Sequence, residues 1–130
     1  MKRFCALVCL AAALFAACKD EQKGPDPAAV AAKAYYDSLA AGRYGGYLSG
    51  VAGADSLPAS YREQLLANAK QFMAAVKEEH GGIQSVSIVR TDTGVVSHRR
   101  DVFLLVSFGD SVKEEVVVPM VESPAGWRMK

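Results

Sequence analysis

The chain has 130 residues, of which 51% are hydrophobic and 22% charged, a balance typical of one globular domain with a proper core. Its 15 basic and 14 acidic side chains nearly cancel, which gives no electrostatic case for a nucleic-acid partner. All 3 cysteines, Cys5, Cys9 and Cys18, lie near the N-terminus, so the rest of the chain has no thiol for a disulfide or a metal site. We expect neither a metal nor a cofactor.

The N-terminal segment has the pattern of an export leader. Lys2 and Arg3 precede an uncharged apolar run, residues 4–17, that ends in small side chains. This run is shorter than the roughly 20 apolar residues that a membrane-spanning helix needs. We therefore expect residues 1–17 to be a removable signal peptide.

The end of this leader carries a further resemblance. Phe15-Ala-Ala-Cys18 resembles the lipobox of bacterial lipoproteins, in which the cysteine is acylated and becomes the first residue. Lys19-Asp-Glu21 resembles the acidic export tag that sends lipoproteins to the cell surface in one group of Gram-negative bacteria. The resemblance implies a lipid anchor on Cys18 at the bacterial outer membrane, exposed on the cell surface or facing the periplasm. One acyl chain binds a membrane only marginally, so multiple acylation is implied.

The composition then divides the chain into a tether and a domain. Residues 18–27 are charged, contain glycine and two prolines, and lack bulky apolar side chains after the cysteine, which predicts a lipidated flexible tether. Residues 28–130 are expected to form a single domain.

The first helix of this domain is expected over residues 28–41. Asp26 is a favourable N-cap residue, Pro27 is favourable at the first helical position, and Gly42 is expected to end the helix. Its apolar stripe is expected to contain Val30, Ala34, Leu39 and one of Tyr35 and Tyr36.

A glycine-rich segment and a second helix follow. Residues 42–55 contain five glycines and should form turns or a frayed helical piece, held by Tyr44, Tyr47, Leu48 and Val51. Ser56 or Ser60 is expected to cap the second helix, because Ser60 and Glu63 fit a capping box. Gly81 and Gly82 should end it after His80. Its apolar stripe is expected to contain Tyr61, Leu65, Ala69, Phe72 and Val76, widened by Leu66 and Met73.

Beyond this helix the pattern changes to that of strands. Strands are expected at residues 83–91, 102–108, 112–121 and 127–130, separated by short turns. Pro119 indicates a bulge or an edge. Residues 95–101 either extend a strand or form a loop. Because the connections are too short for parallel crossovers, neighbouring strands should be antiparallel.

This order predicts an α+β fold, with N-terminal helices packed on one face of a curled antiparallel sheet of about four strands. Two stretches also carry a resemblance. AYYDSLAAGRY (residues 34–44) and FGDSVKEEVVVPMVESPAGWRMK (residues 108–130) resemble the first helix and the closing strands of small secreted domains of the nuclear-transport-factor-2-like (NTF2-like), or cystatin-like, superfamily. Members of this superfamily include enzymes, ligand carriers and assembly partners, and the lipoprotein versions are largely of unknown function. The resemblance implies a cone-shaped fold but does not decide the function.

Few residues are candidates for acid–base chemistry. His98 and Asp101 could form an oriented base, but four consecutive polar residues at a strand entrance are more typical of a solvated loop. An anion contact through Arg99 and Arg100 is a further alternative. His80 lies at a helix C-terminus, where capping is the expected role. We therefore assign no catalytic residue.

The expected inner face of the sheet is apolar, which favours binding over catalysis. Val102, Leu104, Val106 and Phe108 alternate on it, and its partner strand offers Val116, Val118 and Met120. The main hypothesis is a non-catalytic lipoprotein domain that binds a small apolar ligand or a protein partner. The alternative is a cofactor-free isomerase or hydrolase that uses His98 or Asp37 inside the cone. Candidate pocket residues are Tyr35, Tyr36, Tyr44, Phe72, Leu104, Val106 and Trp127.

The opposite face of the sheet is expected to carry large apolar side chains as well. Phe103, Leu105, Val117 and Val121 fall on this face if the strands pair in simple register. A large apolar patch exposed to solvent is unusual on a monomer, so we expect a homodimer or a protein partner on this face.

Overall fold

The computed structural model describes residues 25–93 and 97–130. The predicted signal peptide, the lipidation site Cys18 and most of the tether lie outside the described residues. Within the described part, no helix has the length and apolarity needed to cross a membrane. The elements follow the order α2 (Pro27–Ala40), α3 (Tyr44–Ser49), η1 (Ala54–Ser56), α4 (Ala59–His80), β1 (Ile83–Asp92), β2 (Arg99–Phe108), β3 (Lys113–Ser123) and β4 (Gly126–Met129).

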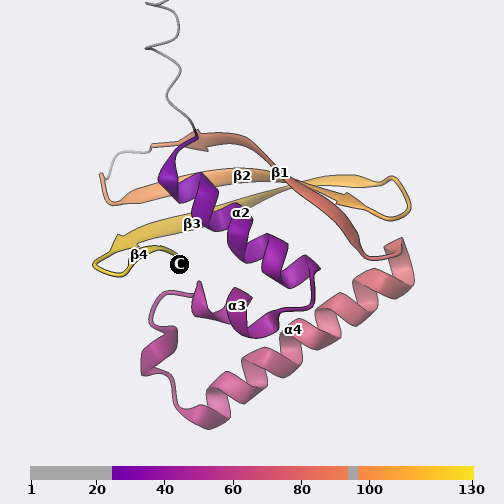
Figure 1. Cartoon of the computed structure of the whole chain (residues 1–130), viewed down its shortest axis with the longest axis horizontal. Helices are drawn as coiled ribbons and strands as arrows, with labels where there is room; N and C mark the ends of the chain where they lie inside the picture. The colour runs from indigo at the N-terminus through magenta and orange to yellow at the C-terminus, as the bar shows by residue number, and fades with distance from the viewer. Residues whose placement is uncertain (1–24, 94–96) are drawn as a thin grey trace, which may run out of the picture.

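The predicted α+β fold is confirmed. The four strands form one sheet in the order β1-β2-β3-β4, and every neighbouring pair is antiparallel. The curled sheet carries α2 across one face, and α3 and α4 lie beyond α2 on the same side (Figure 1). This arrangement leaves the other face of the sheet without a covering layer from the described chain.

The N-terminus of α2 has the predicted cap. The Asp26 carboxylate accepts a hydrogen bond from the backbone N–H of Ala28 at 2.8 Å, and Pro27 occupies the first turn. The predicted stripe is wrong at Val30, which is 50% exposed, and at Ala34, which is also exposed. The buried stripe instead begins with alanines, whose small size lets the helix axis approach the sheet closely. The buried residues of α2 are Ala28, Ala29, Ala32 and Leu39.

The glycine-rich segment is more ordered than its composition indicates, since it contains α3 and η1. Gly50 lies against the ring of Tyr35, and a Cβ at this position would come within 2.5 Å of the ring. The backbone on either side of Val51 also bonds to the end of β4, with Met129 donating to Gly50 and accepting from Ala52. Glycine is thus required at position 50, where α2 and the sheet hold this segment between them.

Helix α4 departs from the sequence prediction at its start. It begins at Ala59 after Pro58, and no side chain caps its N-terminus, so the predicted Ser56 or Ser60 cap is wrong. Ser60 lies inside the first turn because the extended backbone of Pro58 already occupies the N-cap position. The left-handed Gly81 ends the helix as expected.

Only part of the predicted α4 stripe is buried. Ala69, Met73 and Val76 are buried, whereas Tyr61 and Phe72 are 52% and 56% exposed. In Figure 1 the C-terminal end of α4 reaches the sheet, while its N-terminal end extends away from it. The helix therefore leaves part of its apolar surface open on the inner side of the cone.

The sheet register agrees with the predicted alternation. Val102, Leu104 and Val106 are buried on the helix-covered face, and Phe103 faces the opposite side, in register with Val117. Residues Arg99–Asp101 extend β2, which settles part of the segment left open by the sequence. Val95 lies outside the described residues.

Pro119 lies on the inner strand β3, next to the end of β4, and not at a bulge. It pairs in regular register with Asp101 of β2, and its carbonyl accepts a hydrogen bond from the Lys130 N–H at 2.9 Å. Proline has no N–H for the reciprocal bond, so Pro119 makes only one of the two ladder bonds toward Lys130.

The described chain supplies its own core. Val102, Leu104 and Met120 are the largest fully buried side chains, at the centre of the contact between α2 and the sheet. All members of the three apolar clusters lie between Ala28 and Met129.

Candidate functional site

A cavity of about 500 Å³ opens between the inner face of the sheet and the three α-helices. Its volume lies within the usual range for small-molecule pockets, roughly 300–1,000 Å³. It exists because α4 contacts the sheet near its C-terminal end and diverges from it elsewhere. The lining residues are Tyr36, Leu39, Tyr47, Leu48, Val51, Leu65, Asn68, Ala69, Phe72, Ile83, Val106, Phe108, Glu114 and Val116.

Two tyrosines give this apolar cavity hydrogen-bonding groups. The rings of Tyr36 and Tyr47 meet edge to face with centroids 5.9 Å apart. Burial, followed by the proximity of Tyr47, raises the pKa of Tyr36 to about 12, and burial also raises the pKa of Tyr47. Both phenols therefore stay neutral at physiological pH and can donate or accept a hydrogen bond within the cavity.

Glu114 is a lining residue that sequence analysis missed. It pairs with Val106 across the sheet and therefore faces the helix-covered side, like Val116 and Val118. The predicted inner face of this strand begins at Val116, although the two-residue period of a strand also places Glu114 on that face. Extending the pattern by one step would have found it.

Some of the candidate pocket residues line the cavity and others do not. Tyr36, Phe72 and Val106 line it. Leu104 is 0% exposed and lies beneath α2, so it belongs to the packed core. Tyr44 packs against the cluster of Leu39, Ala69 and Met73 and does not itself line the cavity.

Tyr35 and Trp127 form a contact outside the cavity. The Tyr35 hydroxyl donates to the Trp127 carbonyl at 2.8 Å and accepts from the Arg128 guanidinium, also at 2.8 Å. The Arg100 guanidinium lies 5.3 Å from the centre of the Trp127 ring and also contacts the Asp26 carboxylate at 3.4 Å. These residues fasten α2 to β4 and β2, so their role in this structure is to close one end of the cone.

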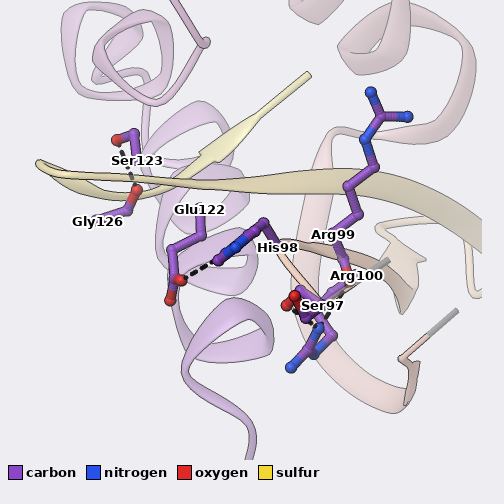
Figure 2. Close-up of polar contacts among 7 residues, drawn as sticks. All are labelled: Ser97, His98, Arg99, Arg100, Glu122, Ser123 and Gly126. Carbon is purple, nitrogen blue, oxygen red and sulfur yellow. Dashed lines mark hydrogen bonds and ion pairs between the residues drawn. The ribbon is translucent and has the colours of Figure 1, made fainter. Parts of the chain in front are cut away.

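The polar segment around His98 lies on the surface. Figure 2 shows the His98 imidazole directed at Glu122, while Arg99 extends in a different direction. The distance from His98 Nδ1 to Glu122 Oε1 is 3.3 Å, and the His98 side chain is 73% exposed. Arg100 donates to the backbone carbonyl of Ser97 at 2.8 Å. Asp101 is exposed on β2 and no bond joins it to His98.

His80 has a partner that the sequence did not indicate. Its Nδ1 lies 2.7 Å from the Asp110 carboxylate, and its ring lies 4.9 Å from the Phe108 ring. The hydrogen bond to Asp110 raises the pKa of His80, and the same bond lowers the pKa of Asp110. His80 lies in the last turn of α4, where the expectation placed it, and its side chain also links the end of α4 to the turn that joins β2 to β3.

The remaining carboxylate considered for chemistry, Asp37, is engaged elsewhere. It forms an ion pair with Lys33 at 2.6 Å, one turn earlier on α2, and does not line the cavity. No group of three or more potential metal ligands occurs among residues 25–93 and 97–130.

A charged side chain covers part of the apolar outer face of the sheet. The Arg90 guanidinium lies 3.8 Å from the centre of the Phe103 ring and 3.3 Å from the Glu115 carboxylate. Phe103, Leu105 and Val121 are partly buried, and Val117 is 52% exposed. Arg90 thus covers part of the predicted interface. This contact was difficult to predict from the sequence, because the register of β1 against β2 shifts between Ile88 and Arg90.

Comparison with known proteins bears on the fold. No family model and no curated protein matches the sequence. A crystal structure described as an NTF2-like transpeptidase from Campylobacter jejuni superposes with a TM-score of 0.60, covering 75% of this chain and 92% of that one. The fold is NTF2-like. At 14% identity, this NTF2-like resemblance carries no activity or substrate to the present chain.

Proposed function

We propose that this protein is a lipid-anchored bacterial envelope protein whose NTF2-like domain binds a small apolar ligand without chemical turnover. The cavity of about 500 Å³ between the helices and the inner sheet face is the observation that carries the proposal. A ligand in this cavity would exchange water for contact with leucine, valine and aromatic side chains, which is the dominant favourable term in binding apolar molecules.

The lining also offers a means of orienting a ligand. Tyr36, Tyr47 and Asn68 supply neutral hydrogen-bonding groups among apolar neighbours. A small number of polar groups on an apolar wall is the usual composition of a small-molecule site. The ligand is therefore expected to be largely apolar, with at least one polar atom.

The positions of the candidate acid–base residues favour binding over the enzyme alternative. His98 is paired with Glu122 on the surface, and Asp37 is paired with Lys33. Neither lines the cavity, so an isomerase or hydrolase built on either residue would lack a substrate site beside it.

Attachment to the membrane is proposed through Cys18. The lipobox-like lead-in and the charged tether support a lipid anchor that holds the domain away from the bilayer. An apolar cavity on a tethered domain would suit a carrier or sensor of envelope molecules.

Fluorescence of N-phenyl-1-naphthylamine, an apolar neutral probe, tests the binding proposal on the domain from Lys19 to Lys130. Val116→Trp would place an indole into the cavity and should weaken probe binding by about tenfold or more. Val117→Trp is the matched control, because its side chain lies on the opposite face. Equal binding by both variants, or no saturable binding by the wild type, would contradict the proposal.

A further inference from the structure

The charge of the cavity lining distinguishes among apolar ligands. Of the residues that line the cavity, Glu114 alone carries a charge, and the lining includes no lysine, arginine or histidine. The two tyrosines are neutral because burial raises the pKa of both. The only formal charge on the cavity lining is therefore one carboxylate on an exposed residue.

Apart from Asp101, which does not line the cavity, Glu114 differs from the other carboxylates of the sheet and its turns. Asp110 pairs with His80, Glu115 with Arg90, and Glu122 with His98. Glu114 has no ion-pair partner within 4.0 Å among the described residues. His80, whose pKa is raised in small part by the charge of Glu114, is held by Asp110 and does not line the cavity.

Placing a carboxylate on an otherwise apolar face has consequences for selectivity. The cross-strand neighbour of Glu114 is Val106. Val116, two residues further along β3, faces the same side and also lines the cavity. An anionic head group near Glu114 would be repelled, whereas an ammonium group would gain both an ion pair and charge-assisted hydrogen bonds.

We propose that the cavity selects amphiphiles with an apolar body and a cationic ammonium head group, with Glu114 as the residue that binds the head group. This inference rests on the proposed function, because the apolar body must occupy the cavity for the head group to reach Glu114. The ligand class is thus an amine or quaternary ammonium compound, and fatty-acid anions are disfavoured.

Displacement of N-phenyl-1-naphthylamine by octylamine, octanol and octanoate at neutral pH tests the proposal on the Lys19–Lys130 domain. These three compounds share an apolar tail and differ in the charge of the head group. Octylamine should displace the probe at a concentration about tenfold lower than octanoate, since attraction and repulsion at a partly exposed carboxylate each contribute a factor of about two to five. Octanol should lie between them.

Glu114→Gln and Glu115→Gln form a matched pair of variants. Both remove one negative charge from the same strand, but Glu115 faces the outer side and pairs with Arg90. Glu114→Gln should bring octylamine and octanoate to within about twofold of each other, with octanol unchanged, and Glu115→Gln should preserve the wild-type order.

The outcomes separate the two proposals. If the probe and octanol bind but the wild type shows no preference for octylamine, or if Glu115→Gln abolishes the preference equally, the head-group assignment is wrong. If Val116→Trp leaves probe and octanol binding unaffected, the cavity itself is not the binding site and the proposed function fails.

Discussion

Removing the Tyr35 hydroxyl with Tyr35→Phe should destabilise the domain although the ring stays in place. This hydroxyl donates to the Trp127 carbonyl and accepts from Arg128, both at 2.8 Å, and it joins α2 to β4 across 92 residues of sequence. A net hydrogen bond contributes about 0.5–1.5 kcal/mol, and one to a charged group about 1.5–3 kcal/mol.

The full sum of these two bonds is an upper bound. Arg128 also donates to the Trp127 carbonyl at 3.1 Å, so each partner retains a bond after the substitution. All of these groups are only partly buried, which lets water replace some of the loss. We therefore expect the free energy of unfolding to fall by about 1–2 kcal/mol.

Urea unfolding followed by circular dichroism measures this change, with the neighbouring Tyr36→Phe as control. Tyr36 has no hydrogen bond to a described residue through its hydroxyl, and its oxygen is not sealed from solvent. Its replacement should change the free energy of unfolding by less than about 0.5 kcal/mol. Equal losses for the two variants would refute the assignment of Tyr35 as the link between α2 and β4.

Three further predictions address pH dependence, anchoring and assembly. The pKa of His80 is raised above its usual 6.5 and that of Asp110 is lowered below 3.8, so their pair should stabilise the fold fully only between these values. The stability lost in Asp110→Asn, measured by urea unfolding, should be largest near the middle of that window and shrink as the pH rises through the folded pKa of His80; a difference that does not change with pH would contradict the pair. Cys18→Ala should release the protein from the membrane fraction without unfolding it, and variant protein with its leader cleaved that still sediments with membranes in high salt would exclude Cys18 as the sole anchor. Charged substitutions at Phe103 and Val117 should convert a homodimer to a folded monomer in analytical ultracentrifugation, and a wild-type domain that is monomeric at high concentration would leave only a different protein as the partner.

The sheet was predictable because its period is short and each strand has one buried face. Alternation in β2 identified Leu104 as inner and Phe103 as outer, and the register with β3 follows the same period. Glu114 lies one step of the same period before Val116, but its charge conceals its place on the inner face. The predicted strand over residues 112–121 contains Glu114, but an inner face identified by its apolar residues begins only at Val116.

The helices were harder to predict in detail, because an apolar stripe on a helix does not show along what length the helix contacts the sheet. Phe72 has the spacing of a core residue but is 56% exposed, since α4 diverges from the sheet along its length. Tyr35 and Tyr36 are adjacent, and sequence alone could not tell which one would face the cavity. The choice depends on the crossing of α2 over the sheet, which tertiary packing determines.

The ion pairs were beyond sequence reasoning for a related reason. His80 and Asp110 are 30 residues apart, and Arg90 and Glu115 are 25 apart. Their contacts depend on strand register and turn geometry together. A net charge near zero gives no indication of which opposite charges will meet.

A crystal structure of the Lys19–Lys130 domain with bound N-phenyl-1-naphthylamine tests the central claim most directly. The account predicts that the probe lies inside the cone, in contact with Tyr36, Ala69 and Val116. A probe bound on the outer sheet face beside Phe103 and Val117, with the cone interior filled by its own side chains, would contradict it.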